Sequence, residues 1–332
     1  MKKRIAINGF GRIGRLTTRQ LLKRSEIELV GINDLTDTKT LAHLFKYDTA
    51  HRTFAGDLGF DEKSISFNGH KISATSETEI KNLPWKDLGV DLVLECTGIF
   101  LSRDKTIDHI NAGAKKVIIS APPKDHSVPT FVLGVNDHGI TGDLDIISNA
   151  SCTTNCLSVI IKVIHERFGI QFASMNTIHA YTQDQRLQDA PHKDLRRARA
   201  AAMNIVPTST GAAKAVEVVY PEIKGRLIAS SYRVPIITGS LIELVCILEK
   251  NVSVEEINQE FHSVSLNSLK NILAYNTDEI VSSDIIGSTY SAIFDAPLTE
   301  AKDNKIKVVA WYDNESGYSA RLADMCVKFA LS

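Results

Sequence analysis

Cysteine is scarce in this sequence: its 332 residues include five, Cys96, Cys152, Cys156, Cys246 and Cys326. They are scattered and odd in number, which argues against the disulfide framework of a secreted protein. Free thiols are typical of a reducing compartment, so we expect a cytoplasmic protein. The sequence predicts no metal site either, because Cys152 and Cys156 have no further cysteine or histidine nearby at ligand spacing.

Net charge and long apolar runs are lacking too. The formal net charge is -1, with 43% hydrophobic and 23% charged residues, which is typical of a globular protein. The near-neutral charge and the lack of an aromatic–basic platform argue against a dedicated nucleic-acid site. No uninterrupted apolar stretch is long enough to span a bilayer, and the opening MKKRIAINGF lacks the apolar region of a secretory signal. We therefore expect neither a membrane protein nor an exported one.

The length favours two domains, because it exceeds what one hydrophobic core usually serves. Over residues 1–150 the short runs RIAIN, IELVGIN, DLVLECTG, KKVIIS, TFVLGV and LDIIS alternate with helical patterns. This alternation predicts a Rossmann-type α/β domain with a parallel sheet. Residues 151–315 contain longer runs, such as QFASMNTIHAYT and SLIELVCILEK, which predict a catalytic α+β domain with a mainly antiparallel or mixed sheet. A final helix, at about 316–332, is expected to pack back on the first domain.

A glycine pattern near the N-terminus indicates dinucleotide binding. AINGFGRIGR places Gly9, Gly11 and Gly14 in G-x-G-x-x-G spacing between a predicted strand and a predicted helix. Asp34 follows 20 positions after Gly14, at the end of the second predicted strand, where a carboxylate accepts hydrogen bonds from a ribose. A carboxylate there repels a 2′-phosphate, and Leu35 to Asp37 offer no arginine to accept one. The sequence therefore predicts NAD as the cofactor.

Cys152 is the candidate nucleophile. It stands in SNASCTTNCL, after a predicted strand and at the start of a predicted helix, where the helix dipole and nearby N–H groups favour a thiolate and lower a cysteine pKa. Cys156 lies one helical turn further on and is expected to be buried. A disulfide between them has poor geometry within a helix. A lone cysteine is more often a packing residue, but the small polar neighbours of Cys152 favour the reactive interpretation.

A cysteine nucleophile needs a base, and His179 in NTIHAYT is the candidate. The basic cluster HKDLRRARAAA, at 192–202, is typical of a solvated surface when taken alone. The segment PTSTGAAK then places Thr210 and Gly211 before a helical pattern, which is a plausible anion cradle. Arg233 ends a further predicted strand. Arginines and hydroxyls around one thiol indicate a phosphorylated substrate.

These residues carry a resemblance to a known family. Over essentially its whole length the sequence resembles the phosphorylating glyceraldehyde-3-phosphate dehydrogenases, through the motifs INGFGRIGR, FKYDTAH, SNASCTTNCL, DLRRARAAA, IVPTSTGAAKA and WYDNESGY. The resemblance implies NAD-dependent oxidation of D-glyceraldehyde 3-phosphate to 1,3-bisphosphoglycerate with inorganic phosphate, through a thioester on the nucleophile, in glycolysis or gluconeogenesis. It also implies a homotetramer in which the loop around residues 180 to 203 lines the cofactor cleft of a neighbouring subunit.

The resemblance further implies residue roles. Cys152 would be the nucleophile and His179 its activator. Thr182 and Arg233 would hold the phosphate of the substrate, and inorganic phosphate would bind Ser151, Thr153, Arg197, Thr210 and Gly211. NAD would contact Arg12, Ile13, Asp34, Ser120 and Asn314, in addition to the glycines of the turn. The chain departs from the family pattern at Thr78, at the segment IITG (236–239) and at Ser316.

Three alternatives stay open from the sequence. Erythrose-4-phosphate dehydrogenase shares the thiol chemistry but typically releases the acyl group to water; the intact TSTG segment and arginine-rich loop favour phosphate. Aspartate-semialdehyde dehydrogenase has a similar two-domain plan but lacks SNASCTTNCL. A protein that mainly binds RNA or a surface partner is disfavoured by the near-zero charge.

Overall fold

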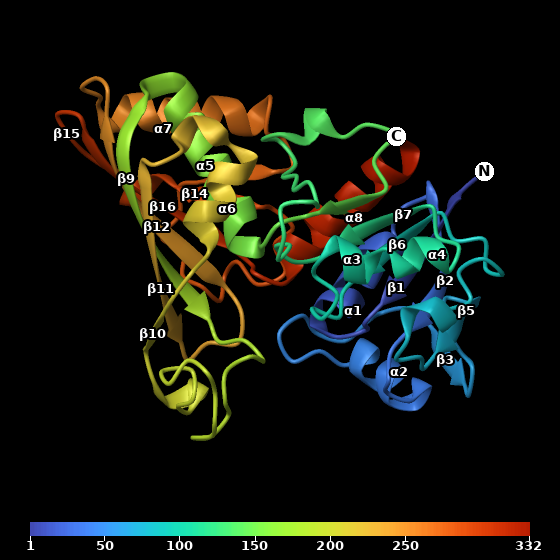
Figure 1. Ribbon diagram of the computed structural model, residues 1–332. Helices are drawn as coiled ribbons and strands as arrows, with labels where there is room; N and C mark the ends of the chain where they lie inside the picture. Colours follow the sequence, from blue (N-terminus) through green and yellow to red (C-terminus); the bar gives the residue numbers. More distant parts are fainter. The chain divides into compact units, whose positions relative to one another are not determined.

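The computed structural model describes all 332 residues, and their contacts divide the chain into two compact units (Figure 1). The first unit comprises residues 1–131, 137–150 and 319–332, and the second comprises 132–136 and 151–318. The final segment of the first unit is the larger part of helix α8 (Ser316–Leu331). None of the helices combines the length and the apolar character needed to cross a membrane.

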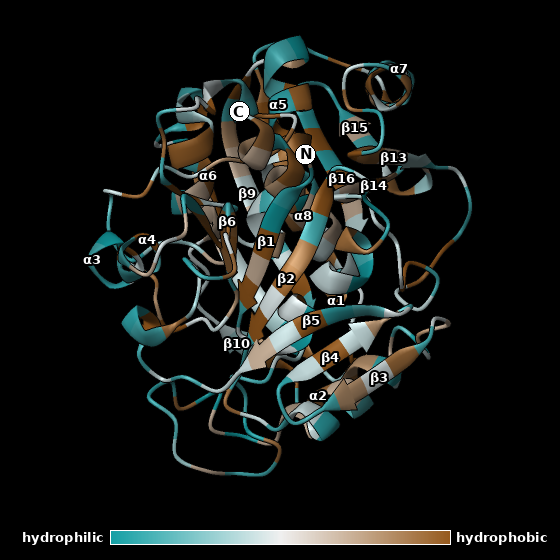
Figure 2. Cartoon of the chain, turned by 90° about the vertical axis from the view of Figure 1, so that its right-hand side faces the viewer, coloured by the Kyte–Doolittle hydropathy of each residue, from teal (hydrophilic) through white to brown (hydrophobic).

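The first unit is built on a sheet with the order β3-β4-β5-β2-β1-β6-β7-β8. Along the sheet, β5, β2, β1, β6, β7 and β8 pair in parallel, whereas β3, β4 and β5 pair antiparallel. Figure 2 shows much of β2 in the hydrophobic colour, as expected of a strand buried on both faces. The predicted Rossmann-type α/β fold is confirmed. The strands are β1 (Lys3–Asn8), β2 (Ile27–Asn33), β3 (Leu58–Asp61), β4 (Ser64–Phe67), β5 (His70–Thr75), β6 (Leu92–Glu95), β7 (Lys116–Ile119) and β8 (Ile146–Ser148), and the helices are α1 (Arg12–Leu21), α2 (Thr38–Lys46), α3 (Arg103–Thr106) and α4 (Asp108–Asn111).

One strand prediction in this region is wrong. The run TFVLGV, at 130–135, forms no strand and contributes only an isolated bridge between Thr130 and Ser148. The backbone turns there instead: the Val135 N–H donates to the Val132 carbonyl at 3.1 Å, and Gly134 has a φ of +84°. An apolar run of this length does not by itself distinguish a strand from a buried turn.

The second unit is built on a mixed sheet with the order β10-β11-β9-β12-β16-β14-β13, to which β15 adds by pairing with β16. This confirms the predicted mixed sheet. The strands are β9 (Ile170–Ala180), β10 (Val206–Thr208), β11 (Leu227–Val234), β12 (Ser240–Leu248), β13 (Leu273–Asn276), β14 (Ala292–Asp295), β15 (Glu300–Lys302) and β16 (Lys305–Tyr312), and the helices are α5 (Cys152–Phe168), α6 (Ala212–Val219) and α7 (Val254–Leu266).

Helix α5 covers one face of this sheet, where it packs against β9, β12, β14 and β16 (Figure 1). We call this the inner face and the opposite one the outer face. Alternation along β9 buries Met175, Thr177 and His179. Ser151 caps α5 by accepting a hydrogen bond from the Thr154 N–H, and Gly169, at a φ of +68°, ends the helix. Cys156 is fully buried, as the sequence predicts, and all five cysteines are free. The polar residues at the start of α5 and at the end of β9 therefore lie together in the buried region between the helix and the sheet.

Candidate functional site

The glycine turn after β1 forms an open cradle in the first unit. Gly9 has a φ of +92°, and a Cβ atom on it would lie 2.7 Å from the Thr97 nitrogen. A Cβ on Gly14 would lie 2.2 Å from the Gly9 carbonyl oxygen, so helix α1 and the turn approach more closely than any side chain allows. Gly11, the N-cap of α1, has free space around it and no side-chain cap. The first N–H groups of α1 are thus available to an anionic group.

Asp34 and Ser120 lie at the carboxyl ends of β2 and β7, on the same edge of the sheet as the glycine turn. The Asp34 carboxylate accepts hydrogen bonds from the Phe10 N–H at 2.7 Å and from the Thr36 N–H at 3.0 Å. These bonds hold the carboxylate beside the turn. The glycines, the open N-terminus of α1 and this carboxylate together fit a dinucleotide such as NAD.

Arg12, the first residue of α1, is tied to the loop after α2. Its guanidinium donates to Asp48 at 2.6 Å, and the Asp48 side chain is only 4% exposed. Burial alone would raise the pKa of Asp48, but hydrogen bonds from His51 and the charge of Arg12 hold this pKa well below its usual range. The side chain of Arg12 is therefore fixed by Asp48, and its backbone N–H remains at the helix start.

Cys152 and His179 meet in the second unit. Cys152 is the first residue of α5, and its Sγ lies 3.6 Å from Nε2 of His179 near the end of β9. The structure thus places the predicted nucleophile beside the predicted base. Strand pairing places Arg233 of β11 directly beside His179 of β9, and the Arg233 Nη1 lies 2.6 Å from the His179 Nδ1.

Nδ1 of His179 also lies 2.7 Å from the carbonyl oxygen of Ala180. A guanidinium only donates and a carbonyl only accepts, so a neutral imidazole satisfies one of these neighbours at a time. If Nδ1 accepts from Arg233, the ring proton is on Nε2 and faces the sulfur. If Nδ1 donates to Ala180, Nε2 is free to accept the thiol proton.

Burial dominates the electrostatics of this pair. It raises the pKa of the Cys152 thiol, against the opposing effects of the Arg233 charge, the Thr153 hydroxyl and the N–H groups at the start of α5. The sequence-based expectation of a lowered thiol pKa is therefore wrong in net direction, because desolvation outweighs the helix start. Burial, together with the charge of Arg233, lowers the pKa of His179 to about 3. Neither group is favoured as an isolated charge.

The predicted anion-binding residues fall into two sets. Arg197 donates to the Thr208 hydroxyl at 2.8 Å and to the Asp184 carboxylate at 2.5 Å. Gly211 is the N-cap of α6, with free space around it and no side-chain cap of its own. The Ala212 N–H donates to the Thr210 hydroxyl at 3.2 Å, which places Thr210 at the same helix start, where an anion could bind. The Nε atom of Arg233 is buried without a hydrogen-bond partner, and a bound anion would satisfy it.

The second set comprises hydroxyl-bearing residues, and these, like Arg197, have protein partners. The Ser151 hydroxyl accepts from the Thr154 N–H at 3.1 Å, and the Thr153 hydroxyl lies 3.0 Å from that of Tyr312. The Thr182 N–H donates to Gln185 at 3.3 Å. Sequence reasoning missed Tyr312, which also bonds to Thr177, and it missed Asp184; the motif WYDNESGY, which contains Tyr312, was the available signal for the tyrosine.

Asn314 follows β16 and is anchored by the segment IITG that departs from the family pattern. Its Oδ1 accepts from the Ser240 hydroxyl at 2.8 Å and from the Gly239 N–H at 3.2 Å. The Thr238 hydroxyl donates to the neighbouring Asp313 at 2.8 Å. The departure at 236–239 thus supports a residue that the resemblance assigns to NAD binding.

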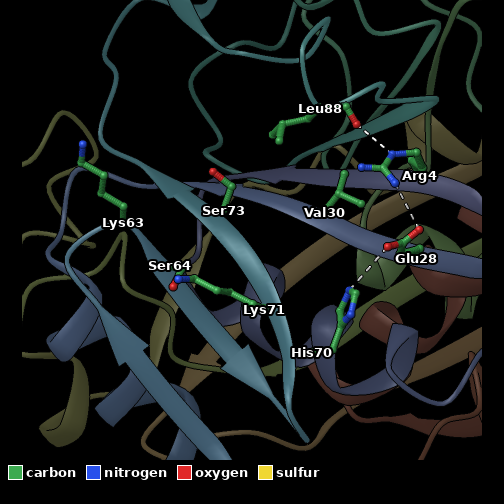
Figure 3. Close-up of a pocket in the computed structure, with 9 residues that line it drawn as sticks. All are labelled: Arg4, Glu28, Val30, Lys63, Ser64, His70, Lys71, Ser73 and Leu88. Atoms are coloured by element: carbon green, nitrogen blue, oxygen red, sulfur yellow. Dashed lines mark hydrogen bonds and ion pairs between the residues drawn. The ribbon is translucent and has the colours of Figure 1, made fainter.

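A cavity of about 320 Å³ in the first unit lies away from these residues (Figure 3). Arg4 and Glu28, near the amino-terminal ends of β1 and β2, line it and form an ion pair at 3.3 Å, and His70 lies 3.9 Å from the other Glu28 oxygen. Dinucleotides bind at the carboxyl ends of parallel strands, so this cavity is not the predicted cofactor site. No group of three or more histidine, cysteine, aspartate or glutamate residues is placed to hold a metal ion.

Comparisons with known proteins cover both units. Residues 3–103 match the family model described as "Glyceraldehyde 3-phosphate dehydrogenase, NAD binding domain", and residues 151–314 match the one described as "Glyceraldehyde 3-phosphate dehydrogenase, C-terminal domain". The chain is 53% identical to the glyceraldehyde-3-phosphate dehydrogenase of Mycolicibacterium smegmatis over 98% of each chain, and 53% identical to that of Thermotoga maritima over 97% of each. It is 48% identical to that of Clostridium pasteurianum over 98% of each. The chain therefore belongs to the glyceraldehyde-3-phosphate dehydrogenase family.

Proposed function

We propose that this protein catalyses the NAD-dependent oxidative phosphorylation of D-glyceraldehyde 3-phosphate to 1,3-bisphosphoglycerate, in glycolysis or gluconeogenesis. The observation that carries the proposal is the 3.6 Å approach of the Cys152 sulfur, at the start of α5, to Nε2 of His179. Family membership and the cationic side chains of Arg233 and Arg197 around this pair support it. The sequence and the N-terminal family model both assign NAD as the cofactor.

The first chemical step is addition of Cys152 to the aldehyde. The phosphate of the substrate binds Arg233 and Thr182, which leaves Nδ1 of His179 to donate to the Ala180 carbonyl and Nε2 to take the thiol proton. The sulfur then bonds to the aldehyde carbon. The oxyanion that forms is stabilised by the protonated Nε2 and by N–H groups at the start of α5.

Oxidation and phosphorylation follow on the same sulfur. His179 protonates the oxyanion, takes this proton back as the carbon loses hydride, and a thioester on Cys152 results. NAD, when bound, supplies the hydride acceptor. Inorganic phosphate then attacks the thioester carbon, the C–S bond breaks, and the acyl phosphate leaves while Cys152 returns as thiolate. The covalent intermediate retains the free energy of the oxidation in the product.

The remaining binding roles are assigned from the sequence. The attacking phosphate contacts Ser151, Thr153, Arg197, Thr210 and Gly211. Gly211 has free space around it, whereas the Arg197 guanidinium is paired with Asp184 and Asp194. NAD contacts Gly9, Gly11, Arg12, Ile13, Gly14, Asp34, Ser120 and Asn314. The cradle around Gly9 and the anchored amide of Asn314 support these assignments.

We also propose a cytoplasmic homotetramer. On the outer face of the second sheet Phe172, Ile228, Tyr232 and Val245 are each more than a third exposed. The loop between β9 and β10 exposes Leu187, Leu195 and Met203 almost fully. Apolar surface of this extent supports burial against further copies of the chain. The five free cysteines support a reducing compartment.

The phosphate requirement tests the proposed reaction. Reduction of NAD by glyceraldehyde 3-phosphate should need added phosphate or arsenate, because the thioester must be cleared by an anion held near Arg197. Cys152→Ala should abolish turnover and leave NAD binding intact, measured by calorimetry. Equal steady-state turnover without phosphate or arsenate would indicate hydrolysis by water and contradict the proposal, as would an active Cys152→Ala variant.

A further inference from the structure

A network of buried polar side chains connects the carboxyl ends of β1, β2 and β6, and the proposed chemistry does not use it. Its centre is Glu95, the last residue of β6, whose side chain is completely buried. The carboxylate accepts from the Asn8 amide at 2.6 Å, from Nε2 of His109 at 3.1 Å, and from the N–H and hydroxyl of Thr97 at 2.8 and 2.5 Å. No cation is among these partners.

One end of the network is a group that can only donate. The indole N–H of Trp85 donates to Nδ1 of His109 at 2.9 Å, and both residues are fully buried. An indole nitrogen has no acceptor capacity, so Nδ1 must accept. His109 is therefore neutral with its proton on Nε2, and its contact with Glu95 is a hydrogen bond from a neutral imidazole.

The other end is also fixed by a donor. Asn8 is the last residue of β1, and its Oδ1 accepts from the amide of Asn33, the last residue of β2, at 2.8 Å. The Oδ1 of Asn33 accepts from the backbone N–H of Glu77 at 2.8 Å, and its amide also donates to the Glu77 carbonyl at 2.9 Å. A flip of either amide would place donor against donor.

These two ends determine what the centre must be. Donors arrive at position 95 from His109 and from Asn8, and neither can reverse without leaving the Trp85 or the Glu77 N–H unsatisfied. Thr97 adds a third fixed donor, its backbone N–H, and a hydroxyl that can donate or accept. The Asn8 and His109 donors meet one oxygen of Glu95 and the Thr97 N–H meets the other, so both atoms must accept, as those of a carboxylate do. Glutamine has the same shape, but its amide nitrogen cannot accept and would face at least one of these fixed donors.

The network holds the parts of the dinucleotide cradle in place. Glu95 holds Thr97 through two hydrogen bonds. The Thr97 backbone lies so close to Gly9 that a side chain at position 9 would collide with it. Asn8 directly precedes Gly9, and Asn33 directly precedes Asp34. The Gly9 N–H donates to the Asn33 carbonyl at 2.8 Å, which ties the two strand ends together.

We propose that Glu95 is a positioning residue for NAD: its buried charge sets the mutual placement of the glycine turn, the Thr97 turn and Asp34 without touching the cofactor. This inference rests on the proposed function for the identity of the cofactor. It does not depend on the thiol chemistry in the second unit.

The test is Glu95→Gln, measured by NAD binding in calorimetry and by steady-state kinetics. Leaving a fixed buried donor unsatisfied should weaken NAD binding roughly 10- to 100-fold and raise the KM for NAD in parallel. The KM for glyceraldehyde 3-phosphate and the kcat at saturating NAD should change less than about threefold. Ile65→Ala, in β4, is the control: it removes a fully buried side chain of the same unit outside the network. An equal loss of NAD affinity in this control would overturn the proposal.

A second variant separates the charge from simple loss of packing. Asn8→Asp alone places two carboxylates against each other and should weaken NAD binding. In Asn8→Asp/Glu95→Gln the carboxylate has moved to position 8, where it accepts from the new side-chain amide at position 95 and from Asn33, while the His109 N–H, which shared this oxygen of Glu95, is left without an acceptor. Affinity should therefore recover at least fivefold relative to Asn8→Asp, in which two carboxylates face each other. If Glu95→Gln does not fold, Asn8→Asp remains the reference for this recovery.

Absence of recovery in a folded double variant would overturn the proposal. Because calorimetry reads NAD binding directly, a protein that binds NAD as predicted but does not oxidise glyceraldehyde 3-phosphate would contradict the proposed function and leave the role of Glu95 standing.

Discussion

Two neighbours of His179 make opposite demands on its Nδ1 atom. Arg233 can only donate to it and the Ala180 carbonyl can only accept from it, at 2.6 and 2.7 Å. An imidazolium would satisfy Ala180 and Cys152 but would face the guanidinium charge. Burial and the charge of Arg233 therefore keep the imidazole neutral, and the phosphate that we propose to bind Arg233 would relieve this conflict.

The lowered pKa of His179 predicts a pH-dependent stability. Its pKa in the folded protein is about 3, below the ordinary value of about 6.5 that we assign to the unfolded chain. The contribution to stability is complete above the unfolded value and is lost as the pH falls toward the folded one, because only the unfolded chain takes up the proton. Between pH 7 and 5 this amounts to about 2 kcal/mol.

Urea denaturation of the wild type and of His179→Asn at pH 7, 6 and 5 measures this contribution. The difference in unfolding free energy between the two proteins should shrink as the pH falls. A difference that stays constant or grows would show that the imidazole is not held neutral by its surroundings.

At this scale the sequence predicted a pair of residues that lie side by side in the structure, but not their electrostatics. Cys152 and His179 were assigned from their neighbours in the chain, and the structure brings them together. The net direction of the thiol pKa depends on burial by α5 and the sheet, which no local pattern encodes. Glu95 and Tyr312 were missed for the same reason, since their partners other than Thr97 are 14 to 159 residues away along the chain.

Among the elements, α1 and the glycine turn before it support the assignment of NAD, because their backbone N–H groups are placed to bind an anion. The glycines of this turn differ in why they are needed: Gly14 lacks room for a side chain, whereas Gly11 has free space and faces where an anion would bind. Substituting each by alanine therefore separates a packing requirement from a binding requirement.

Gly14→Ala should destabilise the first unit and weaken NAD binding together. Its Cβ would lie 2.2 Å from a backbone oxygen, and forcing such a contact costs roughly 1–3 kcal/mol or more. Gly11→Ala should weaken NAD binding and change the unfolding free energy by less than about 1 kcal/mol. Thermal unfolding and calorimetry on both variants check this; a Gly11→Ala protein as unstable as Gly14→Ala would contradict it.

Element predictions succeeded where the hydrophobic period was unambiguous. RIAIN, IELVGIN and the long runs of the second unit became β1, β2, β9, β11, β12 and β16. The added strands β3 to β5 were not predicted, although Asn68 and Gly69, both at positive φ, form the two-residue hairpin turn that the dipeptide Asn-Gly favours. TFVLGV was assigned as a strand because composition alone does not reveal that its backbone turns.

For the whole molecule, the main feature is the exposed apolar outer face of the second sheet. Alternation along β11 directs Arg233 inward to His179 and directs Ile228 and Tyr232 outward, at 57% and 38% exposure. The strand that supplies the site therefore also supplies the proposed subunit contact. In the proposed tetramer the loop after β9 would lie against the cofactor cleft of another copy, so assembly and NAD affinity should be linked.

Ile228→Asp and Tyr232→Asp should shift the proposed tetramer toward smaller species, because each places a charge in an apolar contact without altering the interior of its own unit. Light scattering after size exclusion measures the mass, and NAD titration of the same samples should show weaker binding in the smaller species. Val281→Asp is the matched control, since Val281 is 58% exposed and lies in the loop after β13. Wild-type mass in both outer-face variants, with altered mass only in the control, would place the interface elsewhere. Reduced mass with unchanged NAD affinity would show that each cradle around Gly9 is complete within one chain.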